Sequence, residues 1–93
     1  MALFHCHMIV NLPADMDPEL RADLMARERA YSQQQQGSGK WPEIWRIAGE
    51  YANISILNVA DADELHEILS GLPMFPYMDI KVTPLAKHPN DVK

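Results

Sequence analysis

The sequence has one cysteine, few basic residues and no long hydrophobic stretch, and each shortage excludes a class of protein. Cys6 is the only cysteine in 93 residues, so the chain cannot form an internal disulfide, and we expect its thiol in the core. The 8 Lys and Arg residues are scattered and the net charge is −5. This balance argues against a nucleic-acid partner, because phosphate binding needs clustered basic side chains. No apolar run is long enough to span a bilayer, and the first residues do not resemble a signal peptide. We therefore expect a cytoplasmic protein with no membrane partner.

The remaining composition is typical of one small globular domain. Apolar residues make up 47% of the chain and charged residues 23%, as in ordinary soluble proteins. A chain of this length buries about two thirds of the surface that its unfolded form exposes. We predict a single domain, residues 1–93, with a modest core that a shared oligomeric interface would support.

Alternating apolar residues and helix-capping residues predict six elements in the order strand, helix, strand, strand, helix, strand. Asp17 with Pro18 and Asp61 with Asp63 are suited to begin the two helices. A proline-interrupted apolar segment at residues 72–77 should form a fixed loop and not a helix. The predicted elements are a strand at residues 3–12, a helix at 18–35, two strands within 40–59 that reverse at Gly49, a short helix after Asp61 and a strand at 78–83.

This order of elements is that of the α+β ferredoxin-like βαββαβ sandwich. Such a fold packs two helices on one face of a four-stranded antiparallel sheet. The other sheet face then has no cover within one chain. Leu3, Ile9, Ile54 and Ile56 cannot all reach the same core, so we predict an oligomer in which a second subunit covers part of that face.

Glu28 is the charged residue of the predicted first helix that is the strongest candidate for a catalytic role. It borders the apolar stripe that Leu20, Leu24 and Tyr31 form at 100° per residue. A carboxylate held near apolar surface has a raised pKa, which suits a general base. The alternative is a surface carboxylate paired with a neighbouring Arg or Ser. Arg27 has a similar ambiguity: its side chain either extends to solvent or binds a small carboxylate.

Other candidate chemistry has weaker support in the sequence. His5 and His7 share one strand face, a spacing that can bind a metal, but no third ligand stands nearby, so we predict no metal site. Glycine-rich phosphate loops and nucleophile elbows are absent, which leaves hydrolase and nucleotide-binding functions without support. Trp41 and Trp45 are predicted to share one strand face, where core or interface packing explains at least one of them.

Several segments, spread over nearly the whole chain, together resemble one enzyme family. They include Leu3-Phe4-His5, Ala30-Tyr31-Ser32-Gln33, Lys40-Trp41-Pro42, Tyr51-Ala-Asn-Ile-Ser-Ile56, Leu69-Ser-Gly-Leu-Pro73 and Phe75-Pro-Tyr-Met-Asp-Ile80. In these segments the sequence is similar to the muconolactone Δ-isomerases. Glu28 also falls in that family's Glu-x-x-Tyr-Ser pattern, together with Tyr31 and Ser32.

The resemblance implies a cofactor-free isomerase that moves the ring double bond of muconolactone to give 3-oxoadipate enol-lactone. This step belongs to catechol degradation in the β-ketoadipate pathway. Relatives form homodecamers with pockets close to subunit contacts, so the implied partners are a small lactone and further copies of the chain. In the implied 1,3-proton shift, Glu28 removes the acidic ring proton and returns a proton to the carbon α to the lactone carbonyl.

The implied reaction assigns further roles to polar residues of this sequence. Tyr51 and Asn53 lie two apart on one strand face and are candidate donors to the negative lactone oxygen of the intermediate. The alternative is that both are solvent-facing strand residues. The substrate carboxylate needs a cation, which Arg46, Arg27 or protonated His5 could supply, and we rank Arg46 first. Ser32, one turn after Glu28, is a candidate to orient that carboxylate.

Two departures from the family pattern leave the identity of the carboxylate anchor open. The position of His7 is often Arg in the family, and that of Arg27 is often small and apolar.

Chloromuconolactone dehalogenases share the scaffold and are an alternative function. A non-catalytic oligomer that binds a small acid is an alternative from another class, and a dimeric α/β-barrel monooxygenase is a third.

Overall fold

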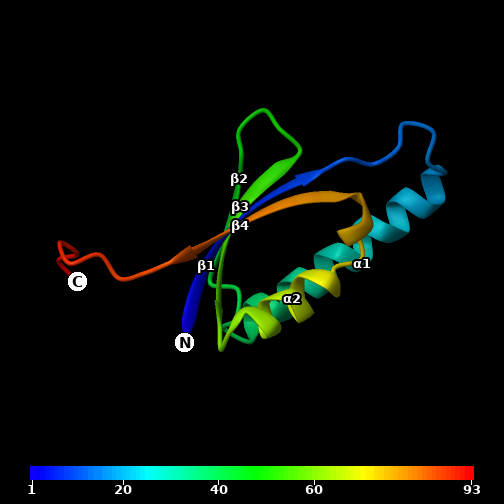
Figure 1. The fold of residues 1–93 in the computed structure, drawn as a ribbon. Coiled ribbons are helices and arrows are strands. Elements are labelled where there is room, and N and C mark those ends of the chain that lie inside the picture. Colours follow the sequence, from blue (N-terminus) through cyan, green and yellow to red (C-terminus); the bar gives the residue numbers. More distant parts are fainter.

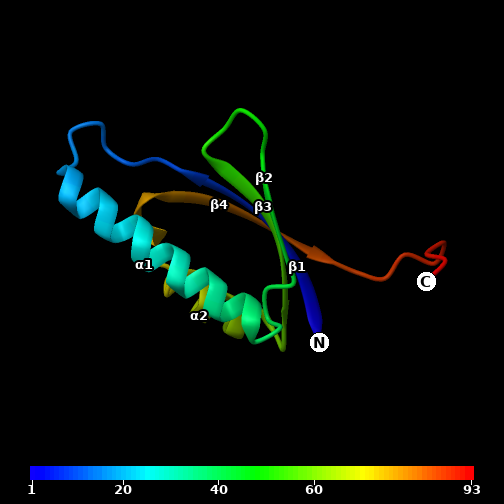
Figure 2. The same cartoon turned by 180° about the vertical axis from the view of Figure 1, so that it is seen from behind.

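The six predicted elements are present in the computed structural model, which describes residues 1–93 (Figure 1). The sheet is antiparallel throughout, with strand order β2-β3-β1-β4. Both helices cover the same face of this sheet, as the view from behind also shows (Figure 2). The ferredoxin-like α+β prediction is therefore confirmed. The elements are β1 (Ala2–Val10), α1 (Pro18–Gly37), β2 (Glu43–Arg46), β3 (Ala52–Val59), α2 (Ala62–Ser70) and β4 (Met78–Leu85).

Short-range signals in the sequence fix where these elements begin and reverse. At the start of α1, an Asp17 side-chain oxygen accepts a hydrogen bond from the Leu20 N–H at 3.1 Å. At the start of α2, Asp61 accepts one from the Glu64 N–H at 2.9 Å. Each bond satisfies a backbone donor that the first helical turn leaves free. Gly49 has a φ of 82° between β2 and β3, a backbone conformation that other residues adopt only with strain.

The segment between α2 and β4 differs from the prediction. The expected loop contains a single 3-10 turn, η1 (Phe75–Tyr77), with a proline in its first positions. A proline is tolerated there because the first N–H groups of a helical turn have no intrahelical partner. The turn leads directly into β4 and places Met74 beneath α1, where its backbone becomes part of the site described below.

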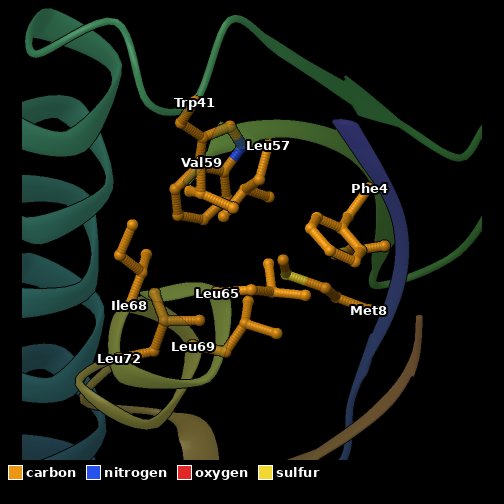
Figure 3. Packing of buried hydrophobic residues seen from close by; sticks show 10 residues of the cluster. Phe4, Met8, Trp41, Leu57, Val59, Leu65, Ile68, Leu69 and Leu72 are labelled. Carbon is orange, nitrogen blue, oxygen red and sulfur yellow. The ribbon is translucent and has the colours of Figure 1, made fainter. Parts of the chain in front are cut away.

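The core lies between the sheet and the helices (Figure 3). Leu65 and Leu69 of α2 face Met8 of β1. Cys6 is fully buried, as predicted, and burial raises the pKa of its thiol to about 11. Helix α1 contributes only Leu24 to the buried residues. The predicted apolar stripe is therefore wrong in part. The cluster comprises Phe4, Cys6, Met8, Trp41, Leu57, Val59, Leu65, Ile68, Leu69 and Leu72.

The two tryptophans do not share a strand face, contrary to the prediction. Trp41 precedes β2 and packs into the core with 2% of its surface exposed. Trp45 lies within β2, pairs with Ile54 and is 65% exposed. The two-residue period of a strand does not extend back to Trp41, because β2 begins only at Glu43. Trp45 therefore points to the sheet face that no helix covers.

No helix combines the length and the hydrophobicity that crossing a bilayer requires.

Candidate active site

A cavity of about 340 Å³ lies between α1 and the end of the sheet where β2 and β3 join. Eight of its 13 lining residues are hydrophobic, and a mostly apolar pocket with a few convergent polar groups is typical of small-molecule sites. The polar groups come from two sides, the middle of α1 and the β2–β3 hairpin. They are Glu28, Arg29, Ser32, Arg46, Asn53 and the phenol of Tyr51.

One face of α1 supplies the helical side of the cavity. Met25, Glu28, Arg29 and Ser32 follow the i, i+3, i+4, i+7 spacing that places side chains on one face of a helix. The sequence prediction considered the stripe through Leu24 and therefore missed Arg29. The second stripe is visible in the sequence once this spacing is tested from Met25.

Glu28 is half-buried in the cavity wall. Its Oε1 atom accepts a hydrogen bond from the Met74 backbone N–H at 3.0 Å. Burial raises the pKa of Glu28, and the Met74 hydrogen bond lowers it by a smaller amount. Neither of the two salt bridges in the structure involves Glu28, so the alternative of a surface ion pair is absent. The carboxylate is held in place and favours protonation more than an exposed glutamate does, which suits a group that takes up a proton.

Ser32 lines the cavity, but its hydroxyl does not contact Glu28. It donates a hydrogen bond to the Arg29 carbonyl oxygen at 3.1 Å, a common arrangement for serine inside a helix. The sequence predicted that Ser32 orients the Glu28 carboxylate. In the structure the hydrogen bond to that carboxylate comes from the Met74 N–H, and Met74 lies 46 residues from Glu28 along the chain.

The hairpin places two hydrogen-bond donors and one cation across the cavity from α1. Tyr51 directly precedes β3, and Asn53 is the second residue of that strand. Arg46 is the last residue of β2 and pairs with Asn53 across the ladder. Its guanidinium carbon lies 5.4 Å from the centre of the Tyr51 ring, within the range of a cation–π contact. The structure thus brings together the three hairpin residues that the sequence singled out.

Arg27 and His5 are not brought to the cavity. The Nε atom of Arg27 lies 2.9 Å from Asp23 Oδ2, and the two side chains are 52% and 60% exposed. His5 lies in the middle of β1, between Phe4 and Cys6, which both point into the core. Because successive strand residues point to opposite faces, His5 points away from the helices. Within one chain, neither residue can contact a molecule in the cavity.

Two cations remain in the cavity wall, and neither forms a salt bridge. Arg46 and Arg29 both line the space, whereas the two ion pairs of the structure join Arg27 to Asp23 and Lys40 to Glu64. No group of three or more His, Cys, Asp or Glu side chains is placed to hold a metal ion. The arrangement combines a proton acceptor, neutral donors and free guanidinium groups. These are the elements for deprotonating a carbon acid that carries a carboxylate.

Comparison with known proteins gives the same family at three levels. A family model described as muconolactone delta-isomerase matches residues 2–91. A muconolactone Delta-isomerase from Rhodococcus opacus is 62% identical over 93 residues, which is 100% of both chains. Muconolactone Delta-isomerase 1 from Acinetobacter lwoffii is 57% identical over 91 residues, 98% of this chain and 95% of that one. A crystal structure of muconolactone isomerase at 3.3 Å resolution has a TM-score of 0.94 at 47% identity, and the match covers 98% of this chain and 95% of that chain.

Proposed function

Because this chain belongs to the muconolactone Δ-isomerase family, we propose that it moves the ring double bond of muconolactone to give 3-oxoadipate enol-lactone. The resemblance noted in the sequence segments is confirmed at the level of the family. The observation that carries the proposal is Glu28: a half-buried carboxylate with a raised pKa in the wall of the cavity. A proton shift between two ring carbons needs one such group and no redox chemistry.

The proposed reaction begins when Glu28 removes the ring proton that is acidic through its conjugation with the lactone carbonyl. The electron pair of the broken C–H bond moves through the ring and leaves a dienolate with negative charge on the carbonyl oxygen. Tyr51 and Asn53 donate hydrogen bonds to that oxygen. Protonated Glu28 then delivers a proton to the carbon α to the carbonyl. The proton removed equals the proton returned, so the proposed cycle uses no cofactor and regenerates the carboxylate.

Proton NMR of the purified protein with muconolactone in deuterium oxide tests this function. We expect the signals of the enol-lactone to replace those of the substrate at a rate proportional to enzyme concentration. Chloride release from a chlorinated muconolactone, without turnover of the plain lactone, would assign the chain to the dehalogenase alternative. Tight binding of muconolactone without any turnover would assign it to the small-acid-binding alternative.

The substrate carboxylate is proposed to bind Arg46, and alanine variants test the assignment. Arg46→Ala should raise KM about tenfold or more with a smaller change in kcat, because loss of a charge-assisted hydrogen bond weakens binding throughout the reaction. Arg27→Ala is the control, since Arg27 pairs with Asp23 outside the cavity, and its KM should stay within about twofold of wild type. If Arg29→Ala raises KM and Arg46→Ala does not, Arg29 is the anchor.

The same family membership supports a proposal for the assembly and the biological setting. We propose a homo-oligomer, a homodecamer as the resemblance implies, that acts in the cytoplasm in the catechol branch of the β-ketoadipate pathway. The uncovered sheet face supports self-association, because Leu3 is 43% and Trp45 65% exposed there. The net charge of −5 supports the absence of nucleic-acid partners.

A further inference from the structure

Ser55 is the single polar residue among the 14 buried residues of the chain, and none of its surface is exposed. It lies in the middle of β3, opposite Cys6 on β1 and Ile44 on β2. A hydroxyl in such apolar surroundings lowers stability unless it forms a hydrogen bond. An alanine or valine would pack there without that requirement. The presence of a hydroxyl at this position therefore calls for a reason other than core packing.

The hydroxyl of Ser55 has one partner, and that partner reaches the cavity. Ser55 Oγ donates a hydrogen bond to Asn53 Oδ1 at 2.7 Å, and Asn53 lines the cavity wall. The two residues are neighbours on one face of the same strand, so their bond joins no separate elements of the fold. It satisfies the buried hydroxyl, and it also holds the Asn53 side chain directly.

The hydroxyl hydrogen of Ser55 has no acceptor other than Asn53 Oδ1, so the bond favours the orientation of the Asn53 amide in which the NH₂ group remains available. An amide side chain has one acceptor oxygen and one NH₂ group with two donor hydrogens. Because Ser55 occupies Oδ1, the NH₂ group lies on the opposite side of the amide, and no group of the chain accepts from it. Rotation of the amide by about 180° would instead direct Oδ1 toward the cavity, and this oxygen is an acceptor that repels a developing oxyanion.

We propose that Ser55 is a positioning residue that holds the Asn53 amide with its NH₂ group toward the lactone carbonyl oxygen of the substrate. The proposal rests on the proposed function and adds a residue to it. Ser55 does not touch the substrate. Its effect passes through Asn53, and the energetic advantage is preorganisation: the donor is already aimed before charge develops on the oxygen.

A double-mutant cycle on turnover of muconolactone tests the proposal. Asn53→Ala should lower kcat about a hundredfold, the loss typical of one donor to an oxyanion. Ser55→Ala should lower kcat about tenfold with KM within about twofold of wild type, because the misaligned amide loses part of that contribution. In the Asn53→Ala background, Ser55→Ala should change kcat by less than about twofold, because the group it positions is gone. Ser55→Thr keeps the hydroxyl and should retain a kcat close to that of wild type.

If Ser55→Ala lowers kcat by the same factor in the wild-type and the Asn53→Ala backgrounds, the proposal is overturned, since Ser55 would then act through general packing. Unchanged kcat in Ser55→Ala would overturn it as well, and so would a Ser55→Thr loss as large as that of Ser55→Ala. If Asn53→Ala keeps the wild-type kcat, Asn53 is not a donor and the positioning role fails with it. Wild-type turnover would in that case still support the proposed function, so the two failures are distinguishable.

Discussion

Glu28→Gln is expected to lower kcat for muconolactone by roughly a hundredfold or more, the contribution typical of a general base. Glutamine has nearly the same shape and its carbonyl oxygen can still accept the hydrogen bond from the Met74 N–H, but it cannot take up the ring proton. KM should change much less than kcat, because the lost interaction belongs to the transition state. Stopped-assay or NMR rates for both proteins at saturating substrate measure the difference.

The stability of the same variant supplies the control. Burial raises the pKa of Glu28 in the folded state, so between its ordinary and its raised pKa the folded protein binds more protons than the unfolded chain. The free energy of unfolding therefore falls as the pH rises through that window, and the ionised carboxylate lowers stability at neutral pH. Glu28→Gln removes this effect and should unfold at the same or a higher temperature than wild type. Equal activity of the two proteins would place the base elsewhere.

The pH dependence of wild-type activity follows from the same raised pKa of Glu28. The ionised form of Glu28 is the base, so kcat/KM should fall as the pH drops through the raised pKa of this carboxyl. A profile without such an acidic limb would contradict the role of Glu28.

The fold could be predicted from the sequence because its signals are local. Strand alternation, the caps at Asp17 and Asp61 and the reversal at Gly49 each act within a few residues, and each agrees with the final arrangement. The errors arose where a local period was extended too far. Trp41 precedes the strand whose period it was assumed to share, and Leu20 is 44% exposed although it lies on the predicted stripe of α1.

The site was less predictable, because it depends on how α1 is rotated against the sheet. Adjacent helical positions differ by about 100°, so Arg27 and Arg29, two positions apart, lie on nearly opposite sides of α1, and the rotation of the helix decides which of them faces the cavity. That rotation is set by tertiary contacts such as the Tyr31 hydroxyl, which donates to the Ile68 carbonyl oxygen at 2.6 Å. The Met74 N–H that holds Glu28 also comes from a distant segment. Local spacing could therefore identify Glu28 but not its partner.

Tyr51→Phe is expected to lower kcat by about a hundredfold, because one donor to a developing oxyanion contributes roughly two to three orders of magnitude in rate. The substitution removes only the hydroxyl. The aromatic ring that lies 5.4 Å from the Arg46 guanidinium carbon remains, so the anchor for the substrate carboxylate keeps its support and KM should change little. Tyr77→Phe is the matched control, because Tyr77 lies in η1 and does not line the cavity.

Comparing kcat of Tyr51→Phe with kcat of Tyr77→Phe separates a catalytic role of the Tyr51 hydroxyl from an effect on general packing. If the Tyr51 hydroxyl stabilises the dienolate, kcat should fall in Tyr51→Phe alone, and the rate of proton removal from the substrate should fall with it. A similar small loss in both variants would show that the Tyr51 hydroxyl does not act on the reacting oxygen. Asn53 would then be the single neutral donor of the hairpin, and its alanine variant should lose correspondingly more activity. The two donors are thus tested against each other on one reaction, with Glu28 unchanged in every variant.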